Sequence, residues 1–138
     1  MESSLALMTP YRMSRIEAIP RLIIAFNEAL NKHDYPAMMK LLSNDCRFET
    51  AHPAPNGDTF SGKAQIIQYW KDFFQRSPHA FFKMEEVNTL GLRCIAPWTC
   101  NFQNDAEKES HIRGVNIFRV EHDLISDIRS YVKGEIGE

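Results

Sequence analysis

Hydrophobic positions in the first half of the chain recur every three or four residues, which places their side chains on one face of an α-helix. A long first helix is predicted by the apolar residues Ile16, Ile19, Ile23, Phe26 and Leu30. A shorter second helix is predicted over residues 35–42. A third, strongly aromatic helix is predicted to follow Gly62 and to end before Ser77 and Pro78, because the residue before a proline disfavours helical geometry.

The second half changes to the alternation of polar and apolar residues that is typical of strands. Four consecutive strands are predicted, over residues 80–90, 93–102, 111–121 and 124–132. An earlier strand over residues 46–51 runs into a loop that contains two prolines and an Asn-Gly pair. Helices first and a sheet last indicate an α+β fold, in which three helices cover one face of a curved antiparallel sheet.

The composition suits one soluble domain, since the chain has 138 residues, a net charge of −2 and 43% hydrophobic residues. We expect residues 1–15 to form a poorly ordered arm and residues 16–138 to form the domain. The small net charge gives no electrostatic reason to expect nucleic acid or a membrane surface as a partner. Residues 1–8 contain only a short apolar run and no basic segment, so we expect them to be neither a signal peptide nor a membrane span.

The cysteines are Cys46, Cys94 and Cys100, an odd number without CxxC spacing. The last two lie about 20 Å apart on one predicted strand, too far for a disulfide. We therefore predict a cytoplasmic protein with free thiols, in which Cys100 is a small buried hydrophobe rather than a nucleophile. The histidines lack metal-ligand spacing, so we expect neither a metal nor another cofactor.

One polar residue stands out in the closing pair of strands. Asn116 alternates in phase with Gly114, Phe118 and Val120, so its side chain is expected to point into the interior. A buried amide has to find a partner, line a wet cavity or reduce stability. Asn116 is therefore the first candidate for a binding site.

Five short motifs occur in a characteristic order along the chain. They are residues 26–34, Phe48-Glu49-Thr50 with Pro53 and Gly57, Gly62 before Tyr69-Trp70, residues 113–119 and residues 129–134. Together they resemble the SnoaL-like branch of the nuclear-transport-factor-2-like (NTF2-like) superfamily over about residues 16–134. The resemblance implies a cystatin-like cone, in which a bent sheet and its helices enclose a pocket, and a homodimer formed through the outer sheet face.

The resemblance also implies where the family's catalytic groups would lie, and in this chain each of them is replaced. The base, the tyrosine and the second acid of the ketosteroid isomerases match Thr50, Phe26 and Asn116. The acid of the polyketide cyclases also falls on Asn116, and an aspartate of the epoxide hydrolases falls on Ser130. Neither threonine nor asparagine transfers a proton near neutral pH, so the chemistries familiar from the family are not expected.

Three polar residues near the expected pocket leave alternatives open. Glu49 is either a displaced acid or base or a carboxylate on the outer face. His52 is either a base at the cone mouth or a plain surface residue. Arg113 reaches the pocket beside Asn116 if Gly114 forms a bulge, and otherwise points outward in a cross-strand pair.

Aromatic side chains on the third helix and on a central strand either line the pocket for a flat apolar ligand or only pack the core. The expected pocket residues are Phe26, Thr50, Tyr69, Trp70, Trp98, Arg113, Asn116, Phe118 and Ser130. We expect a SnoaL-like protein that encloses a small, largely apolar or aromatic organic molecule. One alternative is an enzyme with rearranged groups, using His52 or Glu49 as base and Asn116 as hydrogen-bond donor. The other is a non-catalytic protein-interaction module.

Overall fold

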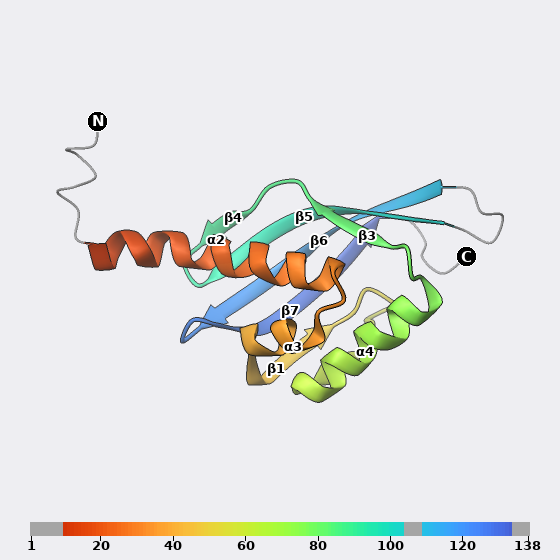
Figure 1. Cartoon of the computed structure of the whole chain (residues 1–138), viewed down its shortest axis with the longest axis horizontal. Coiled ribbons are helices and arrows are strands. Elements are labelled where there is room, and N and C mark those ends of the chain that lie inside the picture. The colour runs from red at the N-terminus through yellow and green to blue at the C-terminus, as the bar shows by residue number, and fades with distance from the viewer. Residues whose placement is uncertain (1–9, 104–108, 134–138) are drawn as a thin grey trace.

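The computed structural model describes residues 10–103 and 109–133 (Figure 1). The described part contains three helices, α2 (Pro10–Asn31), α3 (Tyr35–Leu41) and α4 (Lys63–Arg76). Its strands are β1 (Leu42–Glu49), β2 (Thr59–Ser61), β3 (Phe81–Met84), β4 (Asn88–Leu90), β5 (Arg93–Gln103), β6 (Glu109–Glu121) and β7 (Leu124–Lys133). The three helices lie on one side of a curved sheet, so the expected α+β arrangement is confirmed.

The first helix begins earlier than the hydrophobic period predicts. α2 starts at Pro10 instead of near Ile16, so part of the expected arm over residues 1–15 is helical. A proline suits the first helical position, because the N–H that it lacks would have no partner within the helix. The rest of the expected arm, residues 1–9, lies outside the described residues.

The strand order of the sheet is β2-β1-β7-β6-β5-β3, and β4 also pairs with β5. β5, β6 and β7 form three strands of the predicted four-strand antiparallel meander. The sheet as a whole is mixed, and not antiparallel as expected, because β1 pairs with β7 in parallel. The strand predicted over residues 80–90 is divided into β3 and β4. β2 is not apparent in the sequence, because its three residues become a strand only by pairing with β1.

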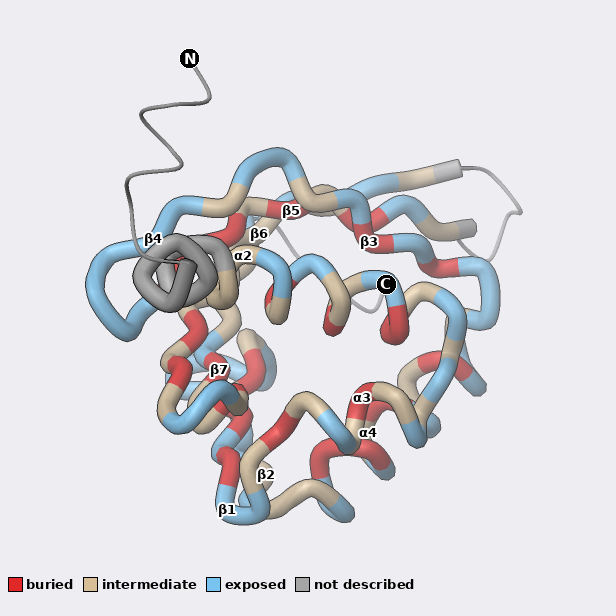
Figure 2. The backbone as a smooth tube through the Cα atoms, turned by 60° about the vertical axis from the view of Figure 1, so that its left-hand side comes forward, coloured by how far each residue is buried: buried red, intermediate tan, exposed pale blue. Residues whose placement is uncertain are grey.

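The core lies between the helices and the concave face of the sheet, and buried positions recur around this common interior (Figure 2). Along β5, for example, Cys94, Ala96 and Trp98 are buried while Ile95 is exposed. This alternation separates an inner face from an outer face along the strand.

Helix α2 also covers the free edge of β3. The Asn31 amide donates to the Phe82 carbonyl oxygen at 2.8 Å and accepts from the Phe82 backbone N–H at 2.8 Å. Asn27 donates to the same carbonyl at 3.1 Å. These amides take the place of a neighbouring strand, and they hold α2 at a fixed distance from the sheet.

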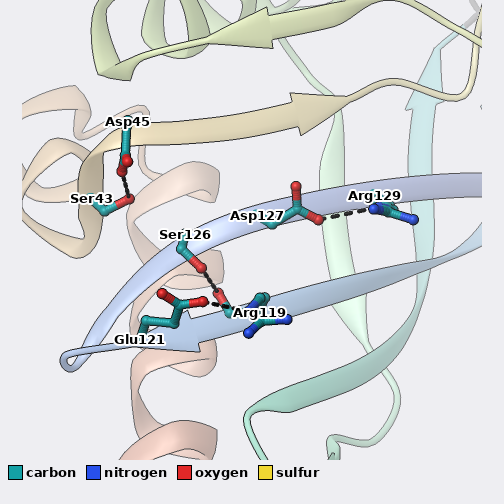
Figure 3. Close-up of polar contacts among 7 residues, drawn as sticks. All are labelled: Ser43, Asp45, Arg119, Glu121, Ser126, Asp127 and Arg129. Atoms are coloured by element: carbon teal, nitrogen blue, oxygen red, sulfur yellow. Dashed lines mark hydrogen bonds and ion pairs between the residues drawn. The ribbon is translucent and has the colours of Figure 1, made fainter.

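The outer face near the β6–β7 turn carries paired charges (Figure 3). Arg119 pairs with Glu121, and the Arg129 Nε lies 3.2 Å from the Asp127 Oδ2. The register of β6 and β7 shifts beside Arg119, where the Ser126 hydroxyl donates to the Arg119 carbonyl oxygen at 3.2 Å. Exposed pairs of this kind contribute little stability, so their main effect is to keep this end of the outer face polar.

Candidate ligand-binding cavity

A cavity of about 580 Å³ lies between helices α2 and α4 and the concave face of the sheet. Cavities of this size commonly hold small organic molecules. Much of its wall consists of the aromatic side chains Phe26, Phe48, Tyr69, Trp70, Phe73, Phe82, Trp98, Phe102 and Phe118.

The aromatic wall is itself well packed. Phe82 meets Trp70 and Trp98 edge to face, with ring centroids 5.7 Å and 5.3 Å apart, and Phe26 meets Phe118 at 6.3 Å. Such pairs stabilise one another beyond the area that they bury. The indole nitrogen of Trp70 is buried and has no hydrogen-bond partner among the described residues. The cavity is therefore bounded by mutually supporting rings.

All of the expected pocket residues except Arg113 line this cavity. The fold brings Phe26 from α2, Tyr69 from α4 and Ser130 from β7 to one space. His52 also lines the cavity, at an exposed position where it opens to solvent.

The position of Arg113 corrects the expectation that it joins the pocket. Its side chain is 60% exposed, and its Nη2 lies 3.6 Å from the Glu85 Oε1. The pairing of β6 is regular from Arg113 to Arg119, so Gly114 forms no bulge. Strand alternation then places Arg113 and Asn116 on opposite faces of the sheet.

Glu49 also lies outside the cavity lining. It pairs with Thr59 on one side and with Arg129 on the other, and its neighbours Phe48 and Thr50 are the residues that face inward. Alternation therefore directs its carboxylate to the outer face, which removes it as a pocket acid or base.

Asn116 is held by one specific hydrogen bond on the sheet wall. The Trp98 indole Nε1 donates to the Asn116 Oδ1 at 3.0 Å. An indole N–H can only donate, so this contact settles which end of the amide faces Trp98. The amide nitrogen of Asn116 has no partner among the described residues, although the residue lines the cavity. Two N–H donors are thus left for a bound molecule.

Gly114 explains how Trp98 reaches that position. A Cβ at Gly114 would lie 2.4 Å from Cζ2 of the Trp98 indole and 2.6 Å from the Tyr131 carbonyl oxygen. Only glycine leaves room for the ring. Sequence reasoning treats Gly114 as a possible bulge, whereas in the structure it makes space for the Trp98 indole.

Ser130 adds a second donor beside Asn116. The two residues face each other across β6 and β7, and both line the cavity. The Ser130 hydroxyl also lacks a hydrogen-bond partner among the described residues. The amide and the hydroxyl together form a donor pair on an otherwise apolar wall.

Thr50 lines the cavity too, but its hydroxyl is already used. It is only 5% exposed, its Oγ1 donates to the His52 carbonyl oxygen at 2.7 Å, and it accepts from the Asp58 backbone N–H at 2.9 Å. A Cβ at Gly57 would lie 1.8 Å from the Thr50 carbonyl oxygen, so the loop over residues 51–58 closes tightly here. The Thr50 hydroxyl therefore holds this loop closed through its two hydrogen bonds.

The opening of the cavity contains charged residues that sequence reasoning missed. Asp58 and Arg76 are exposed and line the cavity close to Tyr69. Burial raises the pKa of the Tyr69 hydroxyl, the Arg76 charge opposes this rise, and the Asp58 charge adds to it. Arg76 is recognisable in retrospect, because it follows Tyr69 by two helical turns. Asp58 is not, since it borders the unpredicted strand β2.

The thiols offer no nucleophile. Cys100 lines the cavity, but burial raises the pKa of its thiol to about 12, and it stays protonated near neutral pH. Within the described residues, no three His, Cys, Asp or Glu side chains are placed to hold a metal ion. None of the helices in the described part is both long and apolar enough to cross a membrane.

A family model for the SnoaL-like domain matches residues 23–128. None of the curated proteins compared with the chain matches it. An NTF2-like protein of unknown function from Mesorhizobium loti has a similar structure with a TM-score of 0.72 and 29% sequence identity. That alignment covers 86% of this chain and 93% of the other. The similarity confirms the NTF2-like fold.

Two further solved structures contain bound molecules. TerC, co-crystallized with polyporic acid, has a TM-score of 0.74 and 12% identity, with 84% of this chain and 92% of the other covered. RV0760c from Mycobacterium tuberculosis, in complex with estradiol-17beta-hemisuccinate, has a TM-score of 0.70 and 18% identity, with 83% and 92% covered. At these identities the similarity shows a shared fold.

Proposed function

We propose that this chain, which belongs to the SnoaL-like domain family, encloses a small and largely apolar organic molecule in its cavity. The observation that carries the proposal is the cavity of about 580 Å³ with aromatic walls and the Asn116–Ser130 donor pair. Burying apolar surface against such walls contributes about 25 cal/mol per Å². Donors without partners favour a ligand that places an acceptor, such as a carbonyl oxygen, beside them. The bound molecules in TerC and RV0760c support this class of ligand.

Thermal unfolding of delipidated protein tests the proposal against a library of steroids, polyketide-like aromatics and terpenoids. A ligand at about one hundred times its Kd should stabilise the protein by about 2.7 kcal/mol. Ala96→Phe is the matched control, because Ala96 is buried and lines the cavity, so a larger side chain there occupies the ligand's space. A library without a stabilising compound would contradict the proposal.

We further propose that the chain forms a homodimer through the outer face of its sheet. On this face Ile95 is 37% exposed and Tyr131 is 48% exposed. Val115 lies between Pro97 and Tyr131, and Ile117 pairs with Ile95, which makes one apolar patch. Such patches commonly mark interfaces between subunits. Light scattering should give a dimer mass for the natural protein and a monomer mass for Val115→Glu; a monomeric natural protein would exclude the dimer.

Catalysis by rearranged groups is a second candidate function, favoured by the position of His52 at the cavity opening. Any compound that is converted should then be converted orders of magnitude more slowly by His52→Ala and by Asn116→Ala. Unchanged rates in both variants would exclude this assignment. The cavity itself argues against a protein-interaction module with a collapsed interior.

We also propose a cytoplasmic location without a nucleic-acid partner. Three buried free cysteines, Cys46, Cys94 and Cys100, suit a reducing compartment. The net charge of −2 provides no general attraction to phosphate backbones. A tagged chain should therefore be found in the cytoplasm. The purified chain should not be retained on a nucleic-acid column.

A further inference from the structure

Helix α4 directs two polar side chains to the opening of the cavity. Tyr69 and Arg76 both line the cavity and are seven residues apart, which is about two turns and the same helix face. Helical side chains tilt toward the N-terminus, so the Arg76 guanidinium is directed back toward Tyr69. The side chains of Tyr69 and Arg76 therefore lie at the same part of the cavity opening.

The loop before β2 brings a carboxylate to the same region. The Thr50 backbone N–H donates to the Asp58 carbonyl oxygen at 2.9 Å, and the Asp58 N–H donates to the Thr50 hydroxyl at 2.9 Å. Asp58 is thus fixed opposite Thr50, and both residues line the cavity. Two residues further on, Phe60 packs against the Tyr69 ring with centroids 5.1 Å apart. Asp58 and Tyr69 are therefore neighbours across the opening.

The electrostatic behaviour of Tyr69 agrees with this placement. Arg76 and Asp58 act on the pKa of its hydroxyl in opposite directions, so both charges lie near that group. Within the described part of the chain, the side chains of Asp58, Tyr69 and Arg76 make no hydrogen bond or ion pair. Opposite charges that flank an opening without pairing leave their hydrogen-bonding capacity available to a ligand.

We propose that Asp58, Tyr69 and Arg76 form a second polar subsite, which binds a neutral group that offers both a hydrogen-bond donor and an acceptor. An α-hydroxy ketone has this character, because its hydroxyl can donate to Asp58 while its carbonyl accepts from Arg76 or Tyr69. A monoanion is attracted by Arg76 but repelled by Asp58, and a cation meets the reverse, so neither gains as much. This inference rests on the proposed function, since it concerns the polar end of the enclosed molecule.

Four compounds with the same diphenyl body test the subsite by titration calorimetry. Benzoin has the hydroxy ketone, deoxybenzoin only the ketone, 2,3-diphenylpropanoate an anion and 1,2-diphenylethylamine a cation. One hydrogen bond to a charged group is expected to change affinity by about tenfold or more. Benzoin should therefore bind about tenfold more tightly than each of the other three compounds.

Two variants assign that difference to the subsite. Asp58→Ala should lower the affinity for benzoin to that for deoxybenzoin and leave deoxybenzoin binding unchanged. Arg76→Met should weaken the binding of benzoin and deoxybenzoin alike, because the carbonyl that they share loses a donor. Arg113→Gln and Asp72→Asn are matched controls, because both residues are exposed and lie outside the cavity lining. The controls should keep the preference for benzoin. Thermal unfolding of each variant confirms that it is folded.

The outcomes separate the subsite from the proposed function. Equal binding of benzoin and deoxybenzoin would overturn the subsite while supporting enclosure of an apolar molecule. Tightest binding of the anion, lost only in Arg76→Met, would also overturn it in favour of a simple cationic site. Failure of all four compounds to bind a protein that another library compound stabilises would overturn the subsite alone. If no library compound stabilises the protein either, both proposals are contradicted.

Discussion

Two polar corners of one cavity, around Thr50 at the end of β1 and around Asn116 within β6, use their hydrogen-bonding groups differently. The Thr50 hydroxyl is bonded to the backbone at His52 and Asp58. The Asn116 amide accepts one bond from Trp98 and keeps its N–H groups for the cavity. Both residues replace acids that the family resemblance implies. The difference shows that a polar residue in a cavity is available to a ligand only where the chain does not already use it.

Gly57→Ala should produce the largest effect, because it disturbs the Thr50 corner directly. The added Cβ would meet the Thr50 carbonyl oxygen at 1.8 Å, at a residue with a φ of +71°. Clash and backbone strain together should lower the free energy of unfolding by about 3 kcal/mol, measured by urea denaturation. Gly91→Ala is the control, since its φ is +64° but nothing lies within 4 Å of its Cβ. Equal losses in the two variants would show that the loop contact is unimportant.

Thr50→Val keeps the shape of the side chain but removes the hydroxyl that holds the loop closed. The Asp58 N–H and the His52 carbonyl oxygen then lose a partner, which should lower the free energy of unfolding by about 2 kcal/mol. Thr50→Ser retains the hydroxyl and should lose much less. Ligand affinity should change little in a folded Thr50→Val protein. A large loss of affinity with unchanged stability would mean that Thr50 binds the ligand after all.

Asn116→Asp should have the opposite signature, with a larger effect on binding than on folding. A carboxylate still accepts from the Trp98 indole, but it cannot donate to a carbonyl oxygen. Affinity for the compound that stabilises the protein best should fall about tenfold or more at neutral pH. It should recover as the pH is lowered, because a protonated carboxyl can donate again. A pH-independent affinity equal to that of the natural protein would exclude Asn116 as a donor.

Arg113→Gln should have the smallest effect. Its partner Glu85 is 37% exposed and Arg113 itself is 60% exposed, so the pair is well screened by solvent. The free energy of unfolding should change by less than about 0.5 kcal/mol, and ligand affinity should not change. A clear loss of affinity would return Arg113 to the binding site.

Much of the fold follows from local sequence patterns. Helical spacing predicts α3 and α4 and most of α2, and alternation predicts β5, β6 and β7 and the inward direction of Asn116. These predictions succeed because periods of 3.6 and 2 residues are set by local backbone geometry. For Arg113 the alternation left two alternatives open, a position in the pocket if Gly114 formed a bulge and an outward position if the strand was regular. The strand is regular at Gly114, so the outward position is correct.

The sequence by itself determined an α+β protein with an aromatic interior and a polar residue facing inward from β6. Only the tertiary structure decided how the polar groups are used, because hydrogen-bond partners distant in the sequence have no local signature. Thr50 and Asp58, eight positions apart, and Trp98 and Asn116, eighteen positions apart, are joined by hydrogen bonds that only the folded chain creates. The same contacts between distant segments create β2 and place Asp58 at the opening. For this reason the Thr50 hydroxyl is used by backbone hydrogen bonds, whereas the Asn116 amide keeps its N–H groups for the cavity.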